Sequence, residues 1–208
     1  MRILSFNVQS CRAGLERVAD VIRRAGPDVA ALNEVRRGQA RRLGRLLGMH
    51  VAFGATLRRY GNALLTKERP SAVRAAGFTI ASGEPRGFVT VTLREGLVVA
   101  AVHLGLTGDE RVAQAGELVA ALAGAENAVV AGDLNEEPGG LAVRVVTSRF
   151  RDAFGDEEAS SGFTFPSEQP SARIDYVFVS DGIRVTKASV LQDVASDHLA
   201  VVADLEIG

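Results

Sequence analysis

The chain has 208 residues, 47% of them hydrophobic and 24% charged, and its formal net charge is −1. Proteins that hold nucleic acid mainly through its phosphates carry a clear basic excess, so this charge predicts no strong binding to duplex DNA. The single cysteine, Cys11, excludes an internal disulfide, and we expect an inert thiol near a strand end. No stretch is long and apolar enough for a transmembrane segment, and the first residues lack the apolar run of a signal peptide, so we expect a cytoplasmic protein.

The first part of the chain has the pattern of alternating strands and helices. Residues 2–8 alternate as a strand, and apolar residues at helical spacing follow over 15–22 until Gly26-Pro27 ends the helix. The short apolar run at 29–32 is typical of a strand that is buried on both faces. The next segment predicts a helix with three leucines facing the core: Leu43, Leu46 and Leu47.

The pattern then changes to that of successive strands. They are expected over residues 49–54, 61–67, 71–80, 86–94 and 97–103. Thr107 and Glu110 form a capping box, which predicts that a helix begins there. Arg111 and Gln114 are expected on the polar side of this helix, and a strand over 127–133 follows it.

The last third predicts a short helix, a long loop and three strands. The helix is expected near 139–147, and residues 155–172, rich in Gly, Ser, Pro and acidic residues, are expected to form one surface loop. The strands are expected over 173–180, 183–191 and 199–206. This order of elements indicates two packed β-layers with helices outside, in a single domain over residues 1–208.

Polar side chains stand at the ends of the predicted strands. They are Asn7, Glu34, His103, Asp133, Asn135, Asp175, Asp197 and His198. When strands pack face to face, their ends gather along one rim, where ligand sites usually form. Each of these residues alone is more typical of a cap or a turn. Their ordered placement behind apolar strands favours one active site.

The residue types suit the hydrolysis of a phosphate ester. Mg²⁺ and Mn²⁺ take oxygen ligands, and Glu34 and Asp197 are the natural direct ligands, with Asn7 as a neutral ligand or an orienting group. His198 can stabilise the growing phosphoryl charge or move a proton. Asp175 can hold the other imidazole nitrogen, as a carboxylate does in hydrolytic triads.

Seven short segments resemble the endonuclease/exonuclease/phosphatase superfamily in order and type along nearly the full chain. They are Leu4-Ser5-Phe6-Asn7, Asn33-Glu34, Tyr60-Gly61-Asn62-Ala63, Val102-His103-Leu104, Gly132-Asp133-Leu134-Asn135, Arg173-Ile174-Asp175-Tyr176-Val177 and Ser196-Asp197-His198. The resemblance implies an α/β fold of the DNase I-like kind, a four-layer α/β sandwich with two central mixed β-sheets.

The resemblance also implies a role for each site residue. Glu34 would hold the metal, Mg²⁺ or Mn²⁺, with Asn7 and Asp197 near it. Asp133 and Asn135 would position the attacking water or the phosphate.

The remaining site residues would act on the substrate. The resemblance implies that His103 touches a phosphate oxygen and that Asp175 orients His198. Asn62, which lies in the third resembling segment, is expected to contact the substrate.

Arginines near these segments are further substrate-binding candidates: Arg36, Arg37, Arg58, Arg59, Arg86 and Arg111. Arg36 lies just past Glu34, and Arg111 lies on the helix that starts just after His103. For Arg36 and Arg111, phosphate binding and a solvated surface position are equally good readings.

Some positions depart from the family pattern. Asn33 stands where glutamine is common, and the chain has no tryptophan. Asp152-Ala153-Phe154 stands where DNA-repair members usually have an Asp-Trp pattern, which argues against a dedicated abasic-site endonuclease. No catalytic group is removed.

The sequence therefore predicts a divalent-metal-dependent phosphoesterase that hydrolyses a phosphodiester or a phosphomonoester. The short chain favours a small or flexible phosphate ester, or single-stranded nucleic acid. The alternative is a catalytically silent relative that binds a partner. An unrelated serine hydrolase is disfavoured because no Gly-x-Ser-x-Gly elbow occurs.

Overall fold

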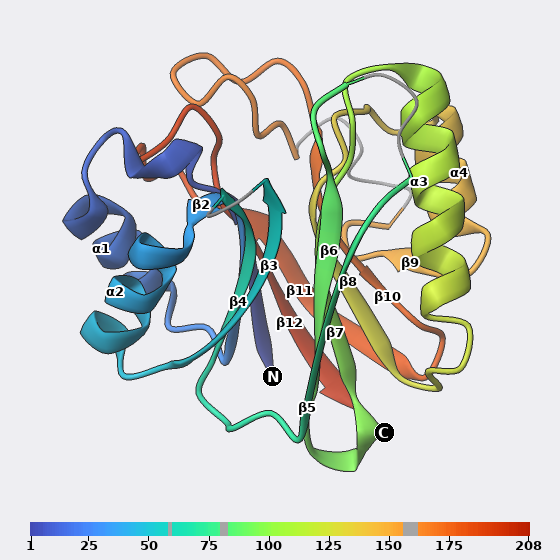
Figure 1. Cartoon of the computed structure of the whole chain (residues 1–208), viewed down its shortest axis with the longest axis horizontal. Coiled ribbons are helices and arrows are strands. Elements are labelled where there is room, and N and C mark those ends of the chain that lie inside the picture. Colours follow the sequence, from blue (N-terminus) through green and yellow to red (C-terminus); the bar gives the residue numbers. More distant parts are fainter. Residues whose placement is uncertain (58–59, 80–82, 156–161) are drawn as a thin grey trace.

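Two six-stranded mixed sheets form the centre of the molecule (Figure 1). The computed structural model describes residues 1–57, 60–79, 83–155 and 162–208. The first sheet has the order β11 (Ile183–Val190), β12 (Val201–Ile207), β1 (Arg2–Asn7), β2 (Val29–Arg36), β4 (Tyr60–Thr66) and β3 (His50–Leu57). The second has the order β5 (Ala72–Gly77), β6 (Gly87–Thr92), β7 (Val98–His103), β8 (Ala128–Asp133), β10 (Asp175–Val179) and β9 (Arg151–Asp152).

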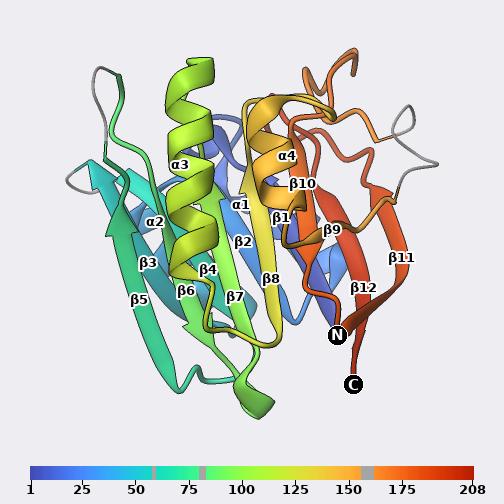
Figure 2. The same cartoon turned by 90° about the vertical axis from the view of Figure 1, so that its right-hand side faces the viewer.

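Helices cover the outer faces of both sheets, which makes four layers (Figures 1 and 2). Helices α1 (Leu15–Ala25) and α2 (Arg37–Leu47) lie on the first sheet, and α3 (Gly108–Ala121) and α4 (Leu141–Thr147) lie on the second. Short 3₁₀ turns occupy Gln9–Cys11 and Arg94–Gly96. The expected four-layer α/β sandwich is therefore confirmed. None of the described helices is long and apolar enough to cross a membrane.

Strand β2 shows why the sequence folds in this way. Ala30 and Leu32 pack in the cluster under α1 and α2, whereas Val29 and Ala31 pack in the cluster between the sheets. Successive side chains of a strand point to opposite faces, so a strand between two apolar layers needs a continuous apolar run. The prediction for residues 29–32 is confirmed.

Two helix faces differ from those expected. Leu46 is 41% exposed, whereas Ala40, Leu43 and Gly44 are buried. At about 100° per residue, Leu46 lies roughly 120° from Ala40 and roughly 160° from Gly44 around the helix. Gln114 was expected on a polar face, but it is buried, and its side-chain oxygen accepts a hydrogen bond of 2.7 Å from the backbone N–H of Gly105.

Loop segments were the least predictable part. The strand expected over 71–80 ends at Gly77, and β9, which pairs with β10, was not predicted. The expected loop over 155–172 lies partly outside the described residues. Within its described part, Phe165 and Ala172 form an isolated β-bridge.

Candidate active site

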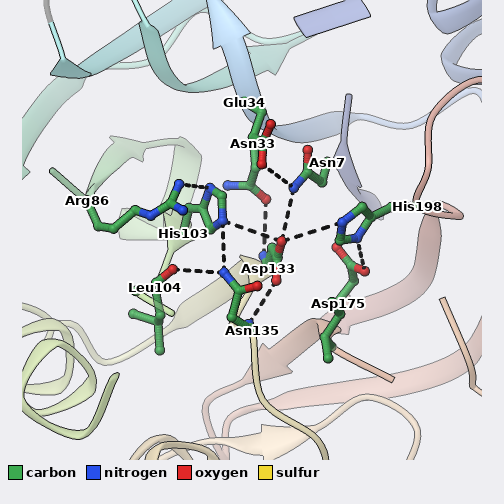
Figure 3. Close-up of polar contacts among 12 residues, drawn as sticks. Asn7, Asn33, Glu34, Arg86, His103, Leu104, Asp133, Asn135, Asp175 and His198 are labelled. Atoms are coloured by element: carbon green, nitrogen blue, oxygen red, sulfur yellow. Dashed lines mark hydrogen bonds and ion pairs between the residues drawn. The ribbon is translucent and has the colours of Figure 1, made fainter. Parts of the chain in front are cut away.

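The polar residues singled out in the sequence meet at one rim of the two sheets (Figure 3). Strands β1 and β2 run parallel in the first sheet, and β7 and β8 run parallel in the second. Asn7, His103 and Asp133 are the last residues of β1, β7 and β8. The carboxyl ends of strands from both sheets therefore supply the site.

Two antiparallel strands complete the rim from the other direction. Asp175 begins β10 and lies opposite Asp133 in the ladder with β8. Asp197 and His198 precede β12, which runs antiparallel to β1. Residues that come before these strands consequently lie beside those that end β1 and β8.

Glu34 reaches the rim through an irregularity in β2. The pairing of β2 with β4 shifts between Leu32 and Val35, and Glu34 has a φ of 54°. A non-glycine residue in this left-handed region costs about 1–3 kcal/mol, and a bulge of this kind re-aims a side chain. The Nδ2 atom of Asn7 donates to Glu34 Oε1 at 3.2 Å, which ties the carboxylate to the end of β1.

Asp133 is held at the centre of the site. Its Oδ2 accepts a hydrogen bond of 3.0 Å from Asn7 Nδ2, and its Oδ1 accepts one of 2.8 Å from the backbone N–H of Asn135. Gly132 precedes it with a φ of 152°, and a Cβ there would stand 1.9 Å from the carbonyl oxygen of Val102. Only glycine therefore lets β8 approach β7 at this point.

Asp133 lies between the two histidines of the site. Its Oδ2 is 3.4 Å from His103 Nε2 and 3.8 Å from His198 Nε2 (Figure 3). Burial raises the pKa of Asp133, and the neighbouring histidines oppose that shift. The carboxylate can thus accept or share a proton with groups on either side.

His198 is paired with Asp175. Its Nδ1–H donates to Asp175 Oδ2 at 2.8 Å, and the Phe165 ring lies 4.9 Å from the imidazole centre. Burial alone would lower the pKa of His198, but Asp175, Asp133 and Asp197 together outweigh it and raise the pKa to about 9. His198 is therefore protonated at neutral pH.

His103 has the opposite electrostatic environment. Arg86 Nη1 lies 3.1 Å from its Nδ1, and Asn135 Nδ2 lies 3.1 Å from its Nε2. Burial lowers the pKa of His103 to about 4, assisted by Arg86 and His198 and opposed by Asp133. One neutral and one protonated imidazole consequently flank the same carboxylate.

Asp197 is linked to the rest of the site by Gln9. Gln9 Nε2 donates to Asp197 Oδ2 at 2.6 Å, and the backbone N–H of Gln9 donates to Asn7 Oδ1 at 3.1 Å. A chain of hydrogen bonds thus runs from Glu34 through Asn7 and Gln9 to Asp197. The three predicted metal-binding residues, Asn7, Glu34 and Asp197, all take part in this series of hydrogen bonds.

Asn33 and Asn62 support the site from behind. Asn33 Nδ2 donates to Asn62 Oδ1 at 3.0 Å and to Val102 O at 2.8 Å, and Asn33 Oδ1 accepts from the backbone N–H of Asp133 at 3.1 Å. Asn62 Nδ2 donates to Gly87 O at 2.7 Å. Both polar groups of the buried Asn62 amide are therefore engaged with protein, behind Asn33 and the backbone of Asp133.

The predicted arginine contacts occupy different settings. The guanidinium of Arg111 is mostly buried, with Nε 3.0 Å from Glu136 Oε1 and Nη1 donating to Leu106 O at 2.7 Å. Glu136 Oε2 in turn accepts from the backbone N–H of Ala142, so Arg111 braces α3 against α4. Arg36 is exposed where β2 ends, two residues past Glu34. Arg58 and Arg59 lie outside the described residues.

Gln9 and Tyr60 received no role from the sequence, and Arg86 was only a candidate for substrate binding, not a partner of His103. Gln9 and Arg86 contact Asp197 and His103 as described above, and the Tyr60 hydroxyl lies beside Glu34. Burial and a hydrogen bond with Glu34 raise the pKa of Tyr60. Gln9 lies in a turn that carries no periodic pattern, so no sequence signal identified it. Arg86 directly precedes an apolar strand, and this position was the sequence signal that could have identified it as a site residue.

Several acidic groups could hold a cation. Asp133, Asp175 and His198 each offer a ligand atom, and these atoms lie within 4.8 Å of one another. The protonated His198, however, cannot bind a metal through Nε2 while that nitrogen carries its proton. Glu34 and Asp197 with the amides beside them form an oxygen-rich set of the kind that Mg²⁺ and Mn²⁺ take. The residues at the rim therefore fit a hard divalent ion.

The model of the Endonuclease/Exonuclease/phosphatase family matches residues 4–198 of this chain. The chain belongs to this family. The match spans every site residue from Asn7 to His198, so the resemblance seen in the seven segments is confirmed. Comparison with curated proteins finds no significant match.

Several solved structures share the fold of this family member. A conserved protein from Enterococcus faecalis V583 aligns with a TM-score of 0.86 at 20% identity, over 100% of both chains. A mannosyl-6-phosphatase from Bacteroides thetaiotaomicron VPI-5482 aligns with a TM-score of 0.79 at 18% identity, also over 100% of both chains. The human Nocturnin catalytic domain, solved with a bound sulfate, aligns with a TM-score of 0.79 at 19% identity, covering 100% of this chain and 93% of Nocturnin.

Proposed function

We propose that this protein hydrolyses a phosphate ester, either a phosphodiester or a phosphomonoester, with the help of Mg²⁺ or Mn²⁺. The observation that carries the proposal is the placement of Asp133 Oδ2 at 3.4 Å from His103 Nε2 and 3.8 Å from His198 Nε2, between an imidazole whose pKa is lowered by burial and one whose pKa is raised by nearby carboxylates. A carboxylate between two such groups can manage the proton of an attacking water while the charged imidazole meets a developing negative charge. A site built only for structure has no use for this separation.

Glu34 and Asp197 would hold the ion, with Asn7 close to both. When bound, the ion supplies positive charge to polarise the phosphate and to favour the ionised form of water. The protein prepares this place through the bulge that aims Glu34 and through the hydrogen bond of 2.6 Å from Gln9 to Asp197.

Each remaining group has a role that its geometry supports. Asp133 accepts the proton of the attacking water, and Asn135, held by its backbone bond to Asp133, helps to position it. The imidazolium of His198 donates toward a phosphoryl oxygen, because Asp175 fixes its ring by a bond of 2.8 Å. His103 contributes a neutral hydrogen bond to the phosphate.

For the substrate, we propose a small or flexible phosphate ester or single-stranded nucleic acid. The mannosyl-6-phosphatase with the same fold is one example of a small ester substrate. Among the described residues, Arg36 is an exposed cation beside the rim that can meet a second phosphate or a flanking one. The net charge of −1 gives the chain no basic excess, so we expect weak binding to duplex DNA.

The test is a substrate panel assayed with Mg²⁺, with Mn²⁺ and with excess EDTA. It should include bis-p-nitrophenyl phosphate, p-nitrophenyl phosphate, sugar phosphates, phospholipids, abasic DNA and single-stranded oligonucleotides. We expect EDTA to abolish hydrolysis and either ion to restore it, with Glu34→Gln strongly impaired and the remote Glu206→Gln unaffected. Full activity in chelator would refute the metal role. Inactivity on the whole panel would favour the silent, partner-binding alternative.

A further inference from the structure

Arg86 is a buried cation without a buried counter-charge among the described residues. Its side chain is 6% exposed, and its ion-pair partner, Glu84 at 3.2 Å, is 73% exposed. Its Nε atom is buried and has no hydrogen-bond partner. Burying a guanidinium costs several kcal/mol unless close partners compensate. A position that carries this cost is expected to serve the site rather than the fold.

The contact of Arg86 with His103 determines where the imidazole proton lies. Arg86 Nη1 is 3.1 Å from His103 Nδ1, and both side chains are buried (Figure 3). A guanidinium can only donate hydrogen bonds. Nδ1 must therefore be the unprotonated, accepting nitrogen, and the single proton of the neutral ring lies on Nε2.

The other side of the ring holds an acceptor and a weaker, competing donor. His103 Nε2 faces Asp133 Oδ2 at 3.4 Å, and a carboxylate can only accept when ionised. Asn135 Nδ2 also lies 3.1 Å from Nε2; one of its two N–H groups is donated to Leu104 O at 3.0 Å, and the second competes for Nε2 as an acceptor. The contact from the Arg86 guanidinium is charge-assisted and therefore stronger than a neutral amide contact, so it favours an accepting Nδ1 and an Nε2–H on the side of the ring that faces Asp133.

We propose that Arg86 is a positioning residue that locks His103 in the neutral Nε2–H form. An imidazolium would place a proton on Nδ1 against the Arg86 donor, and the other neutral tautomer would do the same. The lock makes His103 a hydrogen-bond donor to a phosphoryl oxygen, and it leaves proton transfer to Asp133 and His198. The last step rests on the proposed phosphoesterase function, whereas the tautomer itself does not.

The first experiment reads the tautomer directly, without substrate or metal. The chain has three histidines, His50, His103 and His198, so the imidazole ¹⁵N spectrum of the histidine-labelled protein at pH 7 is simple, and His50→Gln and His198→Gln assign it. We expect His103 to show a protonated Nε2 and a bare Nδ1. A protonated Nδ1 on His103 in the wild-type protein would overturn the proposal.

Substitutions then test whether Arg86 is the cause. We expect Arg86→Met to give a mixture of tautomers or the imidazolium, and Arg86→Lys, which keeps a donor, to retain part of the Nε2–H signal. Glu84→Gln is the matched control because it removes the exposed partner and should leave the His103 signals unchanged. An unchanged His103 spectrum in folded Arg86→Met would overturn the proposal. If Arg86→Met does not fold, the Arg86→Lys and wild-type spectra still decide it.

Steady-state kinetics on a substrate found with the panel provide the functional test. Loss of a group that orients a site residue typically costs about 10- to 100-fold in activity. We expect Arg86→Met to lower kcat by that factor with little change in KM, and Arg86→Lys to recover part of it. An unchanged kcat in Arg86→Met would overturn the role in the reaction. Failure of every substrate would count against the proposed function alone, because the spectra are read independently.

Discussion

The Nδ1–H of His198 donates to Asp175 Oδ2 at 2.8 Å, and both side chains are buried. The two residues come from different sheets, because Asp175 begins β10 and His198 precedes β12. A buried carboxylate that fixes one imidazole nitrogen also stabilises the charged ring. The pair therefore acts as one unit that presents Nε2 to the side of Asp133.

Because the pair is one unit, its two members should not contribute independently. We expect His198→Ala or Asp175→Asn to lower kcat by roughly 10²-fold or more, the scale of losing one preorganised electrostatic group. The double variant should lose little beyond the worse single variant. The measurement is a double-mutant cycle on kcat, with folding checked by circular dichroism. Losses that simply multiply would contradict the pairing.

The raised pKa of His198 should appear in the stability of the protein. The folded-state pKa is about 9, above the usual 6.5, so the stabilising contribution is fully present below pH 6.5 and is lost as the pH rises through 9. We expect His198→Gln to lower the free energy of unfolding by roughly 2–4 kcal/mol more at pH 6 than at pH 10. Urea unfolding in EDTA at both pH values measures this. A difference that grows with pH would have the wrong sign.

The buried ion pair of Arg173 should matter more than an exposed pair of the same type. The Arg173 side chain is 1% exposed, pairs with Asp152, and lies over the rings of Phe154 and Tyr176. We expect Arg173→Met to destabilise the protein by about 3–5 kcal/mol, because it removes a buried guanidinium that pairs with the mostly buried carboxylate of Asp152.

The matched control is Arg184→Met. Its side chain is 68% exposed and pairs with Glu206, so the cost should be at most about 1 kcal/mol. Urea unfolding at pH 7 compares the two variants. Equal losses would mean that burial does not set the strength of the Arg173 pair.

Cys11 should be unreactive in the folded protein. It is buried, and burial raises the pKa of its thiol to about 11. We expect iodoacetamide at pH 8 to modify the native protein far more slowly than the urea-unfolded protein, because the thiolate is the nucleophile. Mass spectrometry follows the modification, with Cys11→Ala as the blank. Equal rates in both states would contradict the burial of the thiol.

Much of the fold and site could be predicted because apolar runs and strand ends are local features. Asp133 and His103 follow buried strands, so their meeting at one rim follows from parallel pairing within the sheet. Glu34 was identified, but β2 continues past it to Arg36. The bulge that aims it depends on the partner strand β4, which no local pattern reveals.

Buried polar residues were the harder part. Gln114 and Arg86 were open to interpretation as surface residues because their types are usually exposed. Their burial depends on tertiary partners, the backbone of Gly105 for Gln114 and the ring of His103 for Arg86. Leu46 is the converse case, an apolar residue on the solvent side of α2, which lies in the outer layer and buries only one face.

The position of Asn33 makes the assembly of the site depend on the docking of the two sheets. Its amide joins β2 of the first sheet to Val102 and Asp133 of the second, so the bond forms only when the two sheets are seated in register. Neither sheet by itself holds a complete set of reacting groups. A partly folded chain would therefore lack the proposed activity, and hydrolysis would begin only when the final docking of the sheets is complete. The time at which hydrolysis appears during refolding would then measure the rate of that last step.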